Sequence, residues 1–455
     1  MVFLCLHSMV ECLNVIISEG EGLGYVFYWV IWLFAMMHLI RWIHVAFLFF
    51  LLLPIALCSN GKLGVLLTGT VDERSNPLLD WFNIEPILET RVVPSRGVTS
   101  GVPLDDGDMK RFIRLYFPRK YGDVASYDLL LLNTPLIYLF DDHQLQWMFD
   151  AIQNGTGGLV APSCLSVYAE IYEPWIASRL QHAFPGDPAA VISGRGGPGV
   201  EDVWFNVIVN RDFPSPILTP FLSLGIEKFT GAYAYFIVPR QGAYIVAWEE
   251  GCFPSVGRVP YMVTWEYGRG RTMTLADTFG QVAGTNSGAF WNPYALRPSG
   301  NQYSFDVLMN MVTYLVGEEP TVDIMTRHRV RNSLVEYRTK MALLLSLVDF
   351  VERFGTTYQG TFEILSNLED IHREAMAEYL ANNFERSQEL LDELLSYSYP
   401  EANRELMELK DRELLWVHIT EWLVVCSALF ISFSLVWTFM VNRYLYRNIN
   451  TTRLR

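Results

Sequence analysis

The sequence has few cysteines, and none of them is arranged to bind a metal. No Cys-x-x-Cys pair and no Cys/His group with zinc spacing occurs. At most one internal disulfide is possible in the central part of the chain, between Cys164 and Cys252, so the protein is not a disulfide scaffold. The six cysteines are Cys5, Cys12, Cys58, Cys164, Cys252 and Cys426.

Basic residues are scarce relative to acidic ones, and the formal net charge is −15 at pH 7. A nucleic-acid partner is excluded, because backbone phosphates require clustered Lys and Arg. No Gly-Lys-Ser/Thr phosphate loop occurs. The Gly-x-Gly-x-x-Gly match at 194–199 precedes strand-like residues instead of a helix, so it is predicted to be a loop and no cofactor is expected.

Charge is absent altogether from Leu423 to Val441, a run of 19 residues. At about 1.5 Å per residue this run spans roughly 28 Å, the thickness of a bilayer core. Tryptophans precede it, tyrosines follow it, and the tail is rich in arginine, as expected of a membrane helix with a cytoplasmic C-terminus. We predict a transmembrane helix over 413–442, a basic cytoplasmic tail over 443–455 and an extracytoplasmic main domain. The flanking residues are Trp416, Trp422, Tyr444, Tyr446, Arg443, Arg447, Arg453 and Arg455.

The N-terminal segment, residues 1–59, allows two interpretations. Tyr25–Cys58 is apolar apart from His38, Arg41 and His44, and residues 1–35 contain no Lys or Arg. A signal peptide beginning near Met36 fits Arg41, the apolar run that follows and the small residues near position 58. A retained membrane anchor fits equally well. Both interpretations place residue 60 outside the cytoplasm.

Residues 60–318 show apolar strands that alternate with amphipathic helices, which indicates an α/β domain. Helices are predicted over 141–152, from Ser166 to Pro174 and over 305–315, and the glycines of 267–270 indicate a hairpin turn. The later strands are closely spaced and predict an antiparallel extension. The predicted strands are 62–67, 87–93, 127–132, 157–161, 203–209, 233–238, 243–247, 260–266 and 271–275.

Residues 319–412 are predicted to form a helical stalk. A helix over 327–354 carries a regular apolar stripe, a second helix is expected over 361–396, and Ser398–Glu401 resembles a capping box that opens a third. Three arginines at the start of the stalk meet either solvent or an anionic partner. They are Arg327, Arg329 and Arg331, and the stripe is Leu334, Tyr337, Met341, Leu344, Val348 and Val351.

Four segments, in this order, resemble the class I glutamine-amidotransferase-like superfamily in its membrane-attached and trehalose-utilisation-type branches. They are YDLLLLNTP at 127–135, the helix and Gly-Gly strand at 141–163, VTWEYGRGRTMTLAD at 263–277, and FWNPY leading to the helix that ends at 317. The resemblance covers about residues 60–317. It implies a flavodoxin-like parallel sheet, here with an antiparallel extension, and a catalytic Cys–His–Glu set in active members.

The residues for that catalysis are incomplete. Cys164 lies at the turn that would carry the nucleophile, but it lacks flanking glycines, and the expected His–Pro–Glu segment is absent. His182 is the only histidine between Cys164 and Glu318. We therefore predict a domain without catalysis, with Cys164 as the only candidate nucleophile.

Other candidate sites follow from position. The carboxyl ends of parallel strands form the usual ligand crevice, so Thr68, Asp72, Asn133 and Ser163 are candidate ligand-binding residues. Asn154 begins an Asn-Gly-Thr sequon and is a candidate glycosylation site. No metal site is predicted, because the Glu369-x-x-His372 pair has no second copy.

The predicted function is a membrane-anchored, extracytoplasmic scaffold or interaction subunit of a membrane complex, with the membrane and other proteins as partners. One alternative is a cysteine-dependent amidohydrolase or amidotransferase, which requires His182 to reach Cys164. Another is a binding module for sugar-like ligands, indicated by several tryptophans. These are Trp81, Trp147, Trp204, Trp265 and Trp291.

Overall fold

The computed structural model divides the chain into two compact units, Met1–Gly61 and Lys62–Arg455, and all residues that it describes lie in the second. The predictions for residues 1–59 and for Asp72, Ser163, Cys164 and Cys252 lie outside the described residues. The described ranges are 62–70, 77–96, 98–99, 102–103, 105–161, 169–188, 204–232, 237–251, 257–277, 279, 289–291, 300–353 and 359–452.

A nine-stranded mixed sheet forms the centre of the α/β domain, in the order β2-β1-β5-β6-β13-β12-β11-β8-β9. The first five strands pair in parallel, and numbered along the chain they follow the order 2-1-3-4-5 of flavodoxin-like sheets. The remaining four pair antiparallel. The predicted fold class is therefore confirmed. The strands are β1 Leu63–Thr70, β2 Leu88–Arg96, β5 Leu129–Asn133, β6 Gly157–Ala161, β8 Trp204–Val209, β9 Lys228–Ala232, β11 Tyr244–Glu250, β12 Arg258–Tyr267 and β13 Gly270–Leu275.

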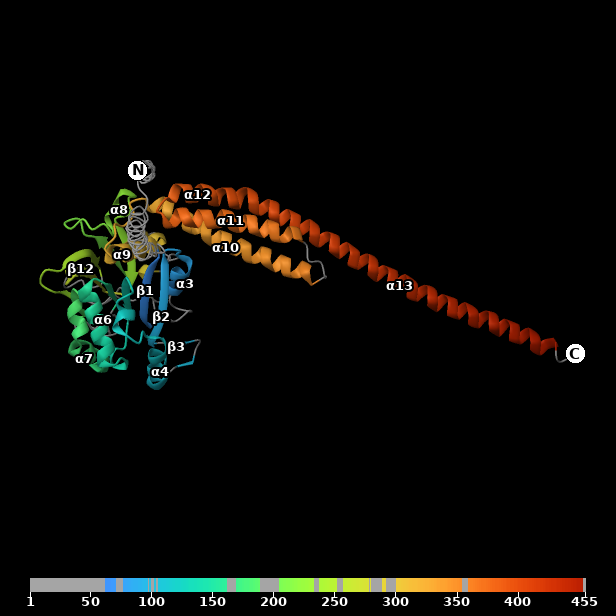
Figure 1. Ribbon diagram of the computed structural model, residues 1–455, viewed down its shortest axis with the longest axis horizontal. Coiled ribbons are helices and arrows are strands. Elements are labelled where there is room, and N and C mark those ends of the chain that lie inside the picture. Colours follow the sequence, from blue (N-terminus) through green and yellow to red (C-terminus); the bar gives the residue numbers. More distant parts are fainter. Residues whose placement is uncertain are drawn as a thin grey trace, which may run out of the picture. The chain divides into compact units, whose positions relative to one another are not determined.

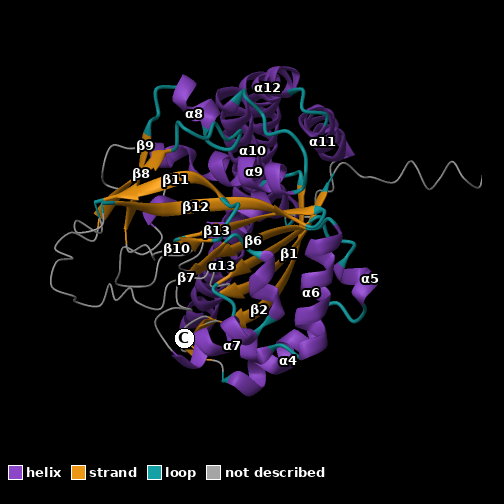
Figure 2. Ribbon diagram, turned by 90° about the vertical axis from the view of Figure 1, so that its left-hand side faces the viewer, coloured by secondary structure: helices purple, strands orange, loops and turns teal. Residues whose placement is uncertain are grey.

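Both faces of the parallel half are buried, which explains its uninterrupted apolar strands. In β5, Leu129 and Leu131 join the core on one face, while Leu130 and Leu132 join the core on the other. Helices α4, α6 and α7 cover one face, and α9 covers the opposite one (Figure 2). The side chains of α3 join the same core as those of α9. These helices are α3 Pro77–Ile84, α4 Asp106–Tyr116, α6 Asp142–Asn154, α7 Ala169–Ala177 and α9 Ser304–Leu315.

Short elements complete the domain. Two small antiparallel pairs, β3 with β4 and β7 with β10, stand apart from the main sheet. The remaining elements are β3 Val98–Thr99, β4 Val102–Pro103, α5 Tyr121–Val124, η3 Ile137–Leu139, η4 Arg179–Ala183, β7 Gly186–Pro188, α8 Thr219–Ser223, β10 Ile237–Pro239, η5 Ala289–Trp291 and η6 Gly300–Tyr303.

Two local predictions differ from the structure. Helix α7 continues past Pro174, and the next residue, Trp175, is buried in the core. Strand β9 was not predicted, because its sequence KFTGA has little apolar character; Asn301 hydrogen-bonds both backbone groups of Thr230 along this edge strand. The described part of the predicted strand 233–238 lies in β10, which pairs with β7. Tertiary contacts, not propensity, determine these segments.

The C-terminal part begins with a three-helix bundle, formed by α10, α11 and the continuous helix that starts with α12 (Figure 1). Helix α10 is Ile324–Glu352, α11 is Gln359–Leu380 and α12 is Phe384–Glu393. The predicted stripe on α10 lies in the bundle core: Leu334, Tyr337, Leu344 and Val351 are buried, and Met341 and Val348 are partly buried against them.

The predicted second helix over 361–396 is wrong, because the chain turns between α11 and α12. Asn382 adopts a left-handed conformation with φ of 60° at this turn. The predicted start at Ser398–Glu401 is also wrong, since α12 continues through a π-helical turn, η7 Leu394–Ser398, into α13 Tyr399–Thr452. There the Tyr399 N–H donates to the Leu394 carbonyl. This wider turn accommodates Pro400, which lacks an N–H, without a break.

Substitutions at Asn382 should change the stability of the protein by a modest, measurable amount. Asn382→Val is expected to lower the free energy of unfolding by about 1–2 kcal/mol, because a β-branched residue is disfavoured in the left-handed region. Asn382→Gly is the matched control and should retain or slightly raise stability. Thermal unfolding in detergent measures both. Equal losses for the two variants would contradict this explanation.

Among the residues that the structure describes, one helix is long and apolar enough to cross a membrane. It runs from Phe384 to Arg447 over 64 residues, and its most apolar part is not buried against the rest of the chain. The helix contains the predicted charge-free run, so α13 is a candidate membrane span.

Candidate functional site

The carboxyl ends of the parallel strands bring two of the predicted ligand residues close together. Gly69 of β1 is in register with Asn133 of β5, and Thr68 is beside Leu132. Thr68 and Asn133 are both fully buried. The Thr68 hydroxyl donates to Ser95 Oγ at 3.2 Å, and Asn133 Oδ1 accepts the backbone N–H of Phe279 at 3.3 Å. Thr68 and Asn133 thus lie at one edge of the sheet, and both side chains make hydrogen bonds within the protein.

The backbone at this edge is closely packed. Gly69 has a φ of +118°, and a Cβ at this position would lie 1.8 Å from the Asn133 carbonyl oxygen. Only glycine fits, because any side chain would overlap the neighbouring backbone. Thr134 adopts a φ of 49° and donates its N–H to the Ala161 carbonyl of β6. The ends of β1, β5 and β6 are therefore fixed relative to one another.

Three polar residues that the sequence did not reveal lie at the same edge of the sheet. Tyr261, Asp277 and Glu249 come from β12, the end of β13 and β11, and all are fully buried. The Tyr261 hydroxyl donates to Asp277 Oδ2 at 3.4 Å. Burial raises the pKa of Tyr261 well above its usual value, and the charges of Asp277 and Glu249 raise it further. Tyr261 is thus a neutral hydrogen-bond donor at physiological pH.

One sequence signal was available for this group. Asp277 comes two residues after the buried strand β13, Asn133 is the last residue of β5, and Glu249 stands near the carboxyl end of β11. Their buried oxygens can orient a polar group or order the loops above the edge. With Thr68 and Asn133 they define the carboxyl-edge cluster.

His182, the base that the amidohydrolase alternative requires, contacts an arginine. The His182 side chain is exposed, and its Nδ1 lies 3.1 Å from Arg240 Nη1. Arg240 also pairs with Asp187, and it hydrogen-bonds Gln181. His182 Nδ1 is therefore already in contact with a side chain of its own domain.

A buried group of charges lies where α10 meets the α/β domain. The Asp306 side chain of α9 is fully buried, with Oδ1 2.8 Å from Arg331 Nη2 and 3.4 Å from Arg327 Nε. Asp306 Oδ2 lies 2.8 Å from His328 Nδ1. Arg331 Nε reaches Glu85 Oε2, which follows α3, at 3.2 Å. We call Glu85, Asp306, Arg327, His328 and Arg331 the junction cluster.

The predicted role of the stalk arginines is therefore wrong for two of them. Arg327 and Arg331 are both 3% exposed and bind carboxylates of their own chain, so they meet neither solvent nor an anionic partner. Arg329 is exposed. Helical periodicity explains the difference, because residues four apart share a helix face and 329 points elsewhere.

The charges around Asp306 favour its ionised form. Burial alone would raise the pKa of Asp306, but the charge of Arg331, the hydrogen bond with His328 and the charge of Arg327 together hold it well below its usual range. The Phe305 ring lies 4.0 Å from the Arg331 guanidinium carbon, a cation–π contact. Two buried arginines thus balance two buried carboxylates.

Contacts from α11 and α10 near Glu85 also join the bundle to the α/β domain. Tyr379 of α11 is fully buried, burial raises the pKa of its hydroxyl, and the nearby Glu85 carboxylate raises it further. Arg338 of α10 donates to the Asn83 carbonyl at 2.8 Å. Helices α3, α9, α10 and α11 therefore meet at one charged junction.

The predicted sugar-binding aromatics are mainly structural. Trp81 and Trp291 are buried, and Trp81 stacks on Phe305 at 5.0 Å. Trp265 donates its indole N–H to the Ala183 carbonyl and stacks on Tyr267. Trp147 and Trp204 are half-buried.

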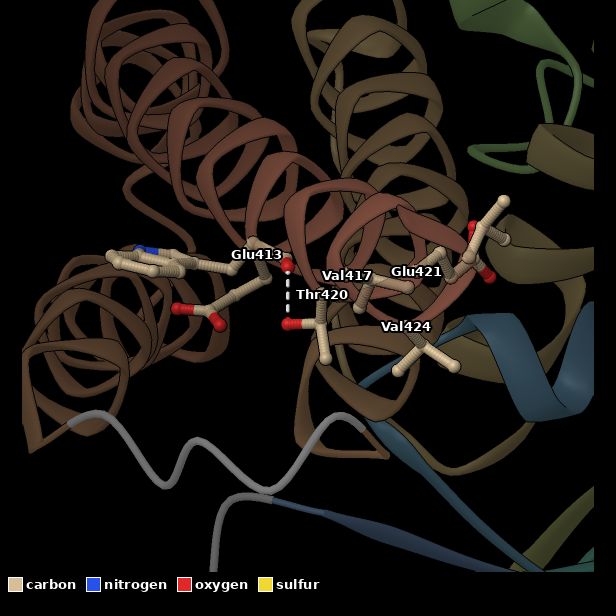
Figure 3. Close-up of a pocket in the computed structure, with 7 residues that line it drawn as sticks. Glu413, Val417, Thr420, Glu421 and Val424 are labelled. Carbon is tan, nitrogen blue, oxygen red and sulfur yellow. Dashed lines mark hydrogen bonds between the residues drawn. The ribbon is translucent and has the colours of Figure 1, made fainter. Parts of the chain in front are cut away.

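Hollows away from the carboxyl edge include two along α13. One, of about 650 Å³, follows one side of the helix, and every residue that lines it belongs to α13 (Figure 3). The second, of about 430 Å³, is also lined by α13 alone. A smaller hollow of about 220 Å³ lies between the β12–β13 turn and the end of α9, and Arg271 there donates to the Tyr314 carbonyl. None of the three brings catalytic groups together.

The structure also describes the surroundings of the candidate glycosylation site and of the Glu369/His372 pair. Asn154 is exposed at the end of α6, and its amide donates to the Tyr121 hydroxyl at 2.7 Å. In the described part of the chain, no group of three or more His, Cys, Asp or Glu side chains could hold a metal ion. His372 stacks on Tyr337 in the bundle, 3.9 Å from Glu369.

Comparisons with known proteins leave the chain without a family. No family model and no curated protein matches it. Two cytoplasmic proteins of Salmonella typhimurium are similar in structure, at 13% and 14% identity; they match 56% and 55% of this chain and 99% and 98% of their own, each with a TM-score of 0.38. A β-galactosidase from Bacillus circulans sp. alkalophilus matches 56% of this chain and 31% of its own at 8% identity, with a TM-score of 0.30. These weak similarities carry no argument about activity, and the amidotransferase-like resemblance stays a prediction.

Proposed function

We propose that this chain is a membrane-anchored scaffold subunit without catalysis, whose α/β domain presents a surface to other proteins of a membrane complex. The observation that carries the proposal is the rigid connection between domain and candidate span. The junction cluster joins α9 to α10, and the bundle core joins α10 to the helix that continues into α13. An enzyme domain held only by a flexible tether would not require buried ion pairs between the domain and its helical stalk.

The contacts of His182 also support a role without catalysis. Its Nδ1 lies 3.1 Å from Arg240 Nη1, so this ring nitrogen already has a partner within the domain. An amidotransferase based on Cys164 would need a different partner for the thiol. The experiment that separates these functions is Cys164→Ala, which should leave both the complex and the cellular role of the protein unchanged.

A ligand-binding module is the second candidate function. The carboxyl-edge cluster favours it, because buried polar side chains in or after five strands lie at the edge where α/β sheets bind ligands. A small ligand held there would stabilise the folded domain in thermal-shift measurements. A scaffold does not require this effect.

The proposed orientation places the α/β domain outside the cytoplasm. Arg443 and Arg447 follow the charge-free run directly, and basic residues near a span remain on the cytoplasmic side. Protease added to intact cells should therefore degrade the α/β domain and spare a tag placed after Arg455. A tag lost together with the domain, while a cytoplasmic marker survives, would contradict this orientation.

The scaffold function itself predicts a stable assembly. In native gels of gently solubilised membranes, the protein should migrate well above the size of a single chain in detergent. Capture through the C-terminal tag followed by mass spectrometry then identifies the partners, with an unrelated single-span protein as control. If the protein solubilised from its native membrane migrates at the size of a single chain, it is not a scaffold subunit.

A further inference from the structure

One face of α13 is apolar both before and within the charge-free run. Uncharged side chains recur along it at alternating spacings of four and three residues, which is the period of two packed helices. All of them are exposed, and in the part of the chain that the structure describes nothing covers the span. We call these residues the α13 seam: Leu415, Ile419, Trp422, Cys426, Leu429, Phe433, Val436 and Met440.

The α13 seam faces away from the three-helix bundle. Ala402 and Leu406 of α13 are buried in the bundle core. Leu406 and Leu415 are nine residues apart, about two and a half helical turns, so their side chains lie on opposite sides of α13. Figure 1 shows α13 continuing beyond the tip where α10 and α11 meet. A second helix can therefore pack along the seam without meeting the bundle of the same chain.

A second regular line on α13 is blocked by the bundle. Thr420, Ser427 and Ser434 recur every seven residues, a spacing that also suits helix packing. The same line leads back through Glu413 to Leu406, which is buried in the bundle core. A long helix that followed this line would run into α10 and α11, so the seam is the face that remains open.

Lipid can cover only part of the seam. The charge-free run begins at Leu423, and Leu415 lies eight residues earlier, about 12 Å along the helix axis. About 9 Å of this remains at a tilt of 40°, whereas each head-group layer is about 5–8 Å thick. Leu415 is 60% exposed and therefore stands in water above the bilayer. Only a partner that crosses the same boundary can cover the whole seam.

A second copy of the chain meets this requirement. It inserts in the same orientation, so in a parallel pair its seam crosses the boundary at the same depth and each seam residue meets its counterpart. Above Leu415 the alternating spacing continues through Arg412 and Glu408, which places Arg412 of each copy beside Glu408 of the other. Within one chain these side chains have only 3.9 Å contacts, to Glu413 and Arg404. The charges at the upper end of the seam are thus complementary between copies.

We propose that two copies of the chain pair in parallel through the α13 seam. The hollow of about 430 Å³ on α13, which Leu415, Ile419, Trp422 and Cys426 help to line, then receives side chains of the second copy. The pair holds two α/β domains on the same side of the membrane, with the two bundles on the outer sides of the paired helices. This inference rests on the membrane-spanning role proposed for α13, and it names a second copy as the first partner of the proposed scaffold.

Cys426 lies on the seam and can report the pairing directly. In a parallel pair the two Cys426 residues face each other, and a disulfide forms where the Cα atoms approach within about 7 Å. A full-length variant that keeps Cys426 as its only cysteine is oxidised in its native membranes with copper phenanthroline and run on a non-reducing gel. Most of the protein should run as a dimer, which a reductant returns to a single chain.

Moving the cysteine around the helix tests which face pairs. With Cys426 replaced by serine, Leu429→Cys should cross-link as Cys426 does. Val424→Cys and Ile431→Cys lie on the opposite side of α13 and are the matched controls, which should remain single chains. Cross-linking that is strongest at Val424→Cys or Ser427→Cys, equal at all positions or absent from all of them would overturn the proposal.

Two differently tagged wild-type copies, expressed together, separate this failure from failure of the scaffold function. Capture through one tag should retain the other copy together with further proteins. Further proteins captured without the second copy would refute the pairing and leave the scaffold function intact. A second copy captured with no other protein would support the pairing and refute the scaffold function.

Discussion

Replacing Asp306 with alanine is expected to lower the free energy of unfolding by about 3–5 kcal/mol, because it leaves buried arginines without their counter-charge. Asp306 is the centre of the junction cluster, bound to Arg327, His328 and Arg331. Both arginines are almost fully buried, so neither can regain its hydration without opening the junction between α9 and α10. Urea unfolding in detergent measures the loss.

An exposed ion pair on the same helix supplies the control. Asp349 pairs with Arg353 at 2.7 Å, and the two side chains are 64% and 75% exposed. Asp349→Ala should cost less than about 1 kcal/mol, because solvent screens the pair. Similar losses for Asp306→Ala and Asp349→Ala would show that the junction cluster does not hold the bundle to the domain.

The contribution of Asp306 should also depend on pH in a defined direction. Its pKa in the folded protein lies below that of an unfolded aspartate, which is about 4. The stabilisation is thus fully present above that value and is lost as the pH falls below it. The difference in unfolding free energy between the wild-type protein and Asp306→Ala should be constant from pH 6 to 8 and shrink under acid conditions. A difference that grows on acidification would contradict the assignment.

Much of the fold follows from local patterns in the sequence. The leucines of β5 are buried on both faces, so an unbroken apolar run correctly predicted a central parallel strand. The stripe from Leu334 to Val351 correctly predicted a packed face of α10, because its period matches a helix surface. Such features depend on neighbours within a few residues.

The junction could not be predicted in this way. Arg331 and Glu85 are separated by 246 positions, so nothing near either residue indicates an ion pair. The turn at Asn382 was missed because one residue in the left-handed region interrupts an otherwise helical composition. For the candidate ligand residues, sequence order placed Thr68 and Asn133 at one edge, but their burial depends on loops and neighbours that periodicity does not describe.

Leu344→Asp is expected to lower the stability of the bundle by several kcal/mol, because it buries a charge with no partner. Leu344 is 1% exposed and lies in a core shared with Leu368 of α11, Leu391 of α12 and Leu406 of α13. Since the chain itself covers this position, the variant should lose the folded bundle and not merely a binding partner. Limited proteolysis and thermal unfolding in detergent report that loss.

Its neighbour supplies both the control and the test of the scaffold. Leu343 is 64% exposed on the outer side of α10, so Leu343→Asp should leave folding unchanged. If another subunit packs on this side of α10, Leu343→Asp yields a folded protein that dissociates from its complex in native gels, whereas Leu344→Asp yields a bundle that unfolds. Leu344→Asp protein with wild-type stability would show that α10 is not packed in a bundle, and the rigid connection between domain and membrane helix would then have no basis.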